Sequence, residues 1–161
     1  MNSLAEDLER FRRGAELLAT VLTGAAGEEV DYVRAPGKWS IRQIMAHVAD
    51  AELVGAQRFR LVIAEDNPTL TAFDGDAWAK NLDYARRKPT QSLDTFRRLR
   101  AENYELLKDL PESVFERFGT HSADGPKTLR SLLTHFADHA ETHARQLQEI
   151  RAEYRQAKGK K

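Results

Sequence analysis

Three histidines follow one another at four-residue steps late in the chain, at positions 135, 139 and 143. In an α-helix, residues four apart are offset by about 40° around the axis and by about 6 Å along it. His139 and His143 can therefore share one helix face and reach a single ion. A catalytic zinc ion usually takes three protein ligands and keeps a further position for water or substrate. The pair therefore predicts a metal site only if a third ligand comes from another element.

His47 is the other histidine that falls within a predicted helix. It lies in the segment IMAHVAD, beside apolar residues with helical spacing, namely Ile44, Val48 and Ala51. Its side chain is expected at or near the interior, where an unpaired imidazole is costly. A neutral histidine that is hydrogen-bonded to a neighbouring helix explains one such residue. Because H-x-x-x-H alone is a weak motif, the three histidines leave a metal site and a polar core as equal alternatives.

The remaining polar and aromatic candidates carry weaker signals. His135 can hydrogen-bond a ligand, line a pocket or face solvent, and a solvated or structural role is our first expectation. His121 lies in a predicted loop and is expected to be exposed. Glu141 sits midway between His139 and His143, about 160° from the inward direction, so the general base of an H-E-x-x-H protease is missing.

Several other residues near the histidines are considered without a catalytic role being assigned to any of them. Trp39 is expected to pack across the start of the helix that carries His47, and Trp78 to line a pocket mouth or anchor a loop. The acidic candidates for supporting a ligand or for acid–base chemistry are Asp50, Glu52, Asp138 and Glu141.

Four amphipathic helices are predicted to position these side chains. Apolar residues recur at three- and four-residue steps in the segments 3–23, 41–64, 92–110 and 128–155. No segment shows the alternation expected of a strand, and no internal repeat is found. The sequence therefore predicts an all-α four-helix bundle, a fold that builds metal sites from inward-facing side chains of facing helices.

Helix ends and connections carry their own signals. Ser40 is the predicted N-cap of the second helix and Thr128 that of the fourth, while Ser92 and Asp94 are expected to cap the third. The long connection between the second and third helices is expected to hold a short helical turn near Trp78.

Composition limits the remaining alternatives. The chain has 161 residues, which fits one domain over residues 1–157, followed by a basic, disordered tail at 158–161. Lysine plus arginine and aspartate plus glutamate number 25 each, so no nucleic-acid partner is expected. The chain has no cysteine, so a metal must use nitrogen and oxygen ligands. The first helix resembles neither a signal peptide nor a membrane span, which predicts a cytoplasmic protein without a membrane partner.

Two segments carry a family resemblance. GKWSIRQIMAHVADAE at 37–52 and HFADHAETHARQL at 135–147 resemble the DinB-like superfamily of bacterial four-helix proteins, also called the YfiT-like metal-dependent hydrolases. The resemblance runs in the same order along nearly the whole chain and is loose between these segments. It implies that His47, His139 and His143 bind a divalent metal, commonly zinc or nickel, and it gives His135 no ligand role. Members often form dimers, so a homodimer is an alternative to a monomer.

The resemblance implies one of two reactions on a small-molecule substrate. The first is hydrolysis, and the second is transfer of a low-molecular-weight thiol, acting as a further cofactor, to an electrophile. In both, the metal lowers the pKa of a bound water or thiol. A non-enzymatic, metal-stabilised binding or stress-response module is the alternative, with the ion enclosed by protein ligands. In a third interpretation no metal binds and the histidines are polar core residues.

Overall fold

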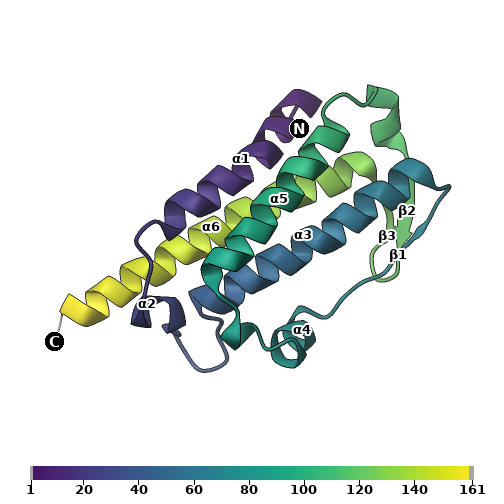
Figure 1. The fold of residues 1–161 in the computed structure, drawn as a ribbon. Coiled ribbons are helices and arrows are strands. Elements are labelled where there is room, and N and C mark those ends of the chain that lie inside the picture. Colours follow the sequence, from purple (N-terminus) through teal and green to yellow (C-terminus); the bar gives the residue numbers. More distant parts are fainter. Residues whose placement is uncertain (1, 160–161) are drawn as a thin grey trace.

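The computed structural model describes residues 2–159 and shows the predicted all-α bundle (Figure 1). Its four long helices are α1 (Leu4–Leu22), α3 (Ile41–Ala64), α5 (Pro89–Leu107) and α6 (Leu129–Gly159). Shorter helical segments connect them, namely α2 (Glu28–Asp31), α4 (Gly75–Asn81), η1 (Tyr84–Arg86) and η2 (Glu112–Glu116). α4 contains Trp78, as expected for that connection. Within the described residues, no helix is long and apolar enough to cross a membrane.

Three short strands at one end of the bundle contradict the prediction that strands are absent. They are β1 (Thr69–Leu70), β2 (Phe118–His121) and β3 (Gly125–Thr128), with β2 in the middle, parallel to β1 and antiparallel to β3. β1 joins through backbone pairs such as Thr120 N–H to the Pro68 carbonyl at 2.9 Å. A Cβ atom at Gly119 would lie 2.9 Å from that same carbonyl, so this approach requires glycine. Pairing between segments so far apart in the chain leaves no local sequence pattern.

The helix starts confirm two predicted caps and correct one. Ser40 forms a capping box with Gln43, whose backbone N–H lies 3.3 Å from the serine Oγ. Thr128 Oγ1 accepts the backbone N–H of Ser131 at 3.0 Å. The third helix begins at Pro89, without a side-chain cap, and Ser92 is buried inside its first turn. Proline at the first helical position already has the required φ, which explains the earlier start.

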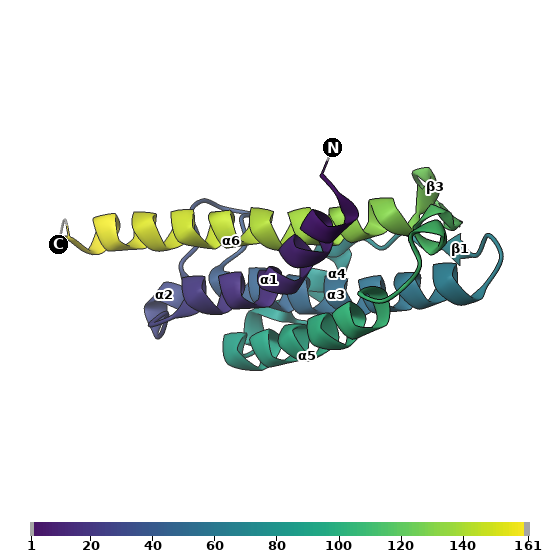
Figure 2. The ribbon, with the colours of Figure 1, turned by 90° about the horizontal axis from the view of Figure 1, so that it is seen from above.

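α6 extends into the segment for which a basic tail was expected, residues 158–161. α6 includes Lys158 and Gly159, and Lys158 Nζ lies 2.5 Å from Glu28 Oε2. Lys160 and Lys161 lie outside the described residues. Seen from above, the last turns of α6 project beyond the ends of the other long helices (Figure 2).

Two of the three apolar clusters of the core meet around one buried ion pair. Phe96 belongs to the first cluster and Phe11 to the second, and the Arg100 guanidinium lies over both rings, 4.6 Å and 3.9 Å from their centroids. Arg100 is 1% exposed and donates two hydrogen bonds to Glu52, at 3.0 Å and 2.7 Å. It also donates to the carbonyls of Phe11 and Phe136. This one side chain of α5 therefore contacts α1, α3 and α6.

We expect Arg100→Met to lower the free energy of unfolding by about 3–5 kcal/mol, because it leaves the Glu52 carboxylate buried without its partner. The double variant Arg100→Met/Glu52→Met should lose less than the single one. Urea denaturation of metal-free protein measures both, and Arg12→Met at an exposed surface pair is the control. A single variant as stable as the control would show that the pair does not hold the helices together.

Candidate metal centre

Three imidazoles from two helices converge on one point. His47 Nε2 lies 3.1 Å from His139 Nε2, and His143 Nε2 lies 3.1 Å from that same His139 atom. The ligand nitrogens of the three rings all lie within 4.8 Å of one another. α3 and α6 run side by side in opposite directions (Figure 1). His47 near the start of α3 therefore meets His139 and His143 near the middle of α6. The structure thus brings together the three residues that the sequence predicted.

The spacing of these nitrogens fits a common metal ligand set. Two nitrogens bound to a tetrahedral zinc ion at about 2.05 Å lie about 3.3 Å apart. The two 3.1 Å separations are close to this value. Among residues 2–159, no further histidine, cysteine or carboxylate joins the group. Three nitrogen ligands with no fourth protein ligand can hold a divalent ion and leave it accessible.

The three histidines are neutral near physiological pH, as metal binding requires. The pKa of His47 is lowered to about 4 and that of His139 to about 2, mainly by burial and in part by the nearby histidines. Burial also lowers the pKa of His143. His143 Nδ1 lies 2.9 Å from Gln146 Oε1, and a proton donated there leaves Nε2 with its lone pair facing the other two rings. Neutral imidazoles bind a metal without first losing a proton.

An aromatic wall, formed by Trp39 and Phe73, lies beside His47. The Trp39 ring centroid lies 5.0 Å from that of His47, and the Phe73 centroid lies 6.3 Å away. A Cβ atom at Gly75 would lie 3.7 Å from His47 Cε1, so the chain passes directly over the ring. His47 Nδ1 is buried and has no hydrogen-bond partner among the described residues. Trp39 thus contacts the site, beyond the packing role expected of it.

Sequence reasoning did not identify Phe73 or Gly75 as part of the site. Phe73 lies in the connection that leads from α3 to α4, and Gly75 is the first residue of α4. The length of the segment between the long helices was the only available signal.

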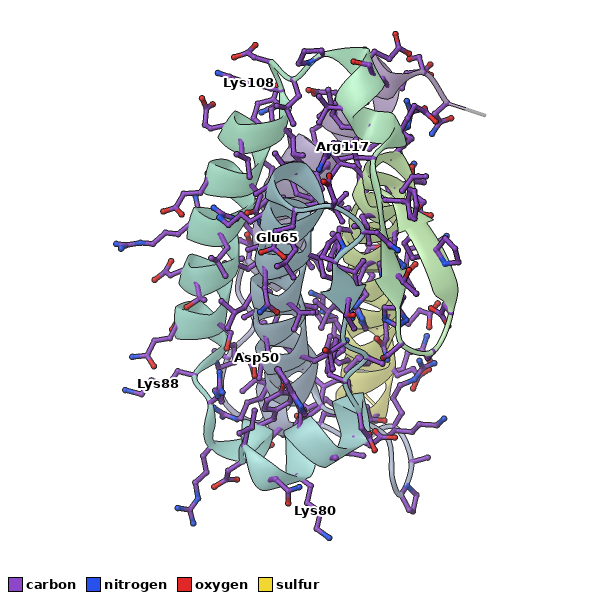
Figure 3. The ribbon with its side chains drawn as sticks, turned by 90° about the vertical axis from the view of Figure 1, so that its right-hand side faces the viewer. Asp50, Glu65, Lys80, Lys88, Lys108 and Arg117 are labelled. Atoms are coloured by element: carbon purple, nitrogen blue, oxygen red, sulfur yellow. The ribbon has the colours of Figure 1, made fainter. Side chains whose placement is uncertain are left out.

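The four acidic candidates all have partners away from the imidazoles. Asp50 accepts the Tyr84 hydroxyl at 2.8 Å and pairs with Arg87. Figure 3 shows Asp50 on α3, above α4. Glu52 pairs with Arg100, as described above. Asp138 and Glu141 pair with Arg10 of α1. None of them occupies the position of a general base at the cluster.

The two remaining histidines lie along the same side of the bundle. His135 is exposed, with its ring centroid 6.1 Å from that of His139. His121 corrects our expectation of an exposed loop residue, since it ends β2 and its side chain is 10% exposed. Its Nε2 lies 3.1 Å from Arg58 Nη2. The loop in which it was placed is the β2–β3 hairpin.

We expect purified protein to hold about one divalent ion per chain. His47→Ala and His143→Ala should lose it after dialysis, because two imidazoles remain. His135→Ala, one turn away on α6, is the matched control and should keep the ion. Elemental analysis by mass spectrometry measures each. Equal metal content in all four proteins, or none in the wild type, would contradict a three-histidine site.

The metal-free protein should lose stability in acid. Because the pKa of His47 lies near 4 in the folded state and near 6.5 in the unfolded chain, only the unfolded state binds its proton between these values. The free energy of unfolding should therefore fall as the pH drops from about 6.5 to about 4, by a few kcal/mol at most. Urea titrations in a chelator, compared with His47→Gln, measure this; identical pH profiles for the two proteins would refute it.

Known proteins share the sequence pattern of this chain. A profile of the DinB superfamily matches residues 10–147. A protein of Oceanobacillus iheyensis named "Putative metal-dependent hydrolase" is 30% identical over 139 residues, which are 86% of this chain and 76% of that protein. "Putative metal-dependent hydrolase YfiT" of Bacillus subtilis is 27% identical over 124 residues, which are 76% of this chain and 69% of that protein.

The fold is shared as well. The solved structure of YfiT from Bacillus subtilis is described as "a probable metal-dependent hydrolase with an unusual four-helix bundle topology". It matches this structure with a TM-score of 0.88 at 22% sequence identity, over 96% of this chain and 90% of that one. The profile match covers most of the chain, including both histidine segments. The chain belongs to the DinB superfamily.

Proposed function

We propose that the protein is a metal-dependent enzyme in which His47, His139 and His143 hold one divalent cation, zinc or nickel, and act on a small molecule. The observation that carries this proposal is the size of the ligand group. Within the described part of the chain, three imidazoles meet and no fourth ligand residue joins them. Catalytic metal sites keep such an open position, whereas structural zinc sites are closed by four protein ligands. The names of the relatives support the same class of activity.

The ion would supply Lewis acidity, which makes a water or a thiol nucleophilic near neutral pH. The residues around it have separate tasks. Gln146 holds the tautomer of His143 that presents Nε2 to the ion. Trp39 and Phe73 form an apolar wall beside His47, which excludes water from that side of the site. The connection that carries Phe73 would shape the space for the substrate.

Two reaction types fit this site, and different observations favour them. Hydrolysis agrees with the names of the relatives. Transfer of a low-molecular-weight thiol agrees with the acidic residues near the histidines, which are engaged by Tyr84, Arg100 and Arg10 and so supply no general base. A thiol held as thiolate at a metal needs no such base. The chain has no cysteine, so the thiol would come from a bound cofactor.

A non-enzymatic, metal-stabilised binding module is the alternative to an enzyme. It requires an ion that is fully enclosed by protein ligands. The group of three imidazoles, without a fourth ligand among residues 2–159, argues against it.

One assay separates the two reactions. Metal-loaded protein is incubated with a panel of esters and amides, and separately with glutathione, bacillithiol or mycothiol plus an alkylating electrophile, and products are identified by mass spectrometry. We expect turnover in one arm, and a loss of at least about 100-fold in His139→Ala, which lacks a ligand. Arg12→Met, on the far surface, should keep full activity. Equal rates in the wild type and His139→Ala would refute an enzymatic role for the site.

A further inference from the structure

Arg58 of α3 is a buried arginine without an acidic partner. It is 8% exposed, and no carboxylate of residues 2–159 lies within 4.0 Å of it. The other buried arginines, Arg100 and Arg151, each pair with a glutamate. Arg58 Nη2 donates to the Thr71 carbonyl at 2.8 Å, and its Nε is buried without any hydrogen-bond partner in the described chain. A buried guanidinium without a carboxylate partner and with an unsatisfied N–H is costly unless a ligand accepts its hydrogen bonds.

The surroundings of Arg58 hold more hydrogen-bond donors than acceptors. Arginine only donates, so His121 Nε2 accepts from Nη2 at 3.1 Å and the proton of the neutral ring belongs on Nδ1. In the other tautomer Nδ1 accepts from the backbone N–H groups of Ala123 and Asp124, at 3.4 Å and 3.2 Å, so the neutral ring cannot accept on both sides at once. Asp124 Oδ2 lies 3.5 Å from the same nitrogen, and this exposed carboxylate also contacts Lys127. An anion would supply the acceptors that Arg58 lacks.

Arg58 and the three-histidine cluster lie on the same face of α3. Arg58 follows His47 by eleven residues, which places the two about 20° apart around the helix and about 16 Å apart along it. Side chains of a helix tilt toward its N-terminus, so Arg58 leans toward the cluster. Gly55 lies between them, where a Cβ atom would be 2.7 Å from the Phe136 ring.

His135 connects this region with the cluster on the side of α6. Its ring lies one turn from His139. Desolvation is the largest cause that lowers the pKa of His135, and the positive charges of Arg58 and Lys127 lower it as well. The β2–β3 hairpin, which carries His121 and Lys127, lies along this side of the bundle (Figure 3). His135 also borders a surface groove of about 680 Å³ that is lined mainly by residues of α1 and α6, so solvent reaches its ring from that side.

We propose that Arg58, together with His121 and His135, forms a subsite that binds a carboxylate group of the molecule whose reacting atom lies at the three-histidine centre. The subsite rests on the proposed function and narrows its substrate to an elongated, acidic small molecule. The distance along α3 requires several bonds between the carboxylate and the reacting atom. The carboxylate can belong to a peptide-like thiol cofactor or to the second substrate.

Binding to metal-free protein tests this subsite without relying on turnover. The probe for the thiol arm is S-methylglutathione, and the probe for the substrate arm is benzoylglycine. The dimethyl ester of the first and the methyl ester of the second lack the carboxylates and are the controls. Isothermal titration calorimetry should show that at least one acid binds, and that Arg58→Met weakens it by about tenfold or more, the loss expected for a charge-assisted hydrogen bond. The esters should bind both proteins equally weakly, and Arg12→Met should behave as the wild type.

The result identifies the source of the carboxylate and separates the two proposals. An affinity that depends on Arg58 in either arm supports the subsite. The arm in which it appears shows whether the thiol cofactor or the second substrate supplies the carboxylate. Equal affinities of both acids for wild type and Arg58→Met would overturn it. Arg58→Met should also keep the metal content and the melting temperature of the wild type; a folding defect, rescued by Arg58→Lys without any change in acid binding, would show a structural role instead. If the purified wild-type protein holds no metal, the proposed function is refuted, whereas this binding test on metal-free protein remains valid.

Discussion

The buried pair of Arg100 and Glu52 is the contact on which the arrangement of the bundle depends. Glu52 follows His47 by five residues on α3, and the carbonyl that Arg100 reaches on α6 belongs to Phe136, three residues before His139. The same guanidinium therefore fixes the two helices that carry the histidines, close to the level at which the imidazoles meet. A charge pair in a core is expensive unless every hydrogen bond is made, and here the carboxylate also accepts from Asn103.

Burial gives the histidine cluster its chemistry. The same packing that brings the rings together removes them from water, which lowers the pKa of each and leaves neutral ligands at physiological pH. The acidic residues along these helices serve the scaffold, since Asp50 holds Tyr84 and Arg87, while Asp138 and Glu141 hold Arg10 of α1. Arg58 lies outside this system of pairs: among residues 2–159 no carboxylate contacts it directly, and Asp124 reaches it only through His121.

The sequence was sufficient to predict the side chains that lie on long, regular helices. His47, His139 and His143 lie on long regular helices, so their faces follow from the spacing of apolar residues, and the caps at Ser40 and Thr128 follow from local hydrogen bonds. Contacts between distant segments determine the pairing of β1 with β2, the approach of Phe73 and Gly75 to His47, and the contact of His121 with Arg58. No local pattern encodes such contacts. The β2–β3 hairpin is local, but its strands have four residues each and contain Gly119, Gly125 and Pro126, so it was taken for a loop and His121 for an exposed residue.

X-ray absorption spectroscopy of the metal-loaded protein tests the central claim most directly, because it counts the imidazoles bound to the ion. The account predicts three imidazole ligands in the wild type, two in His143→Ala reconstituted at high metal concentration, and three in His135→Ala. Two or fewer imidazoles in the wild type, or the loss of one in His135→Ala, would contradict the assignment of His47, His139 and His143 as the metal ligands.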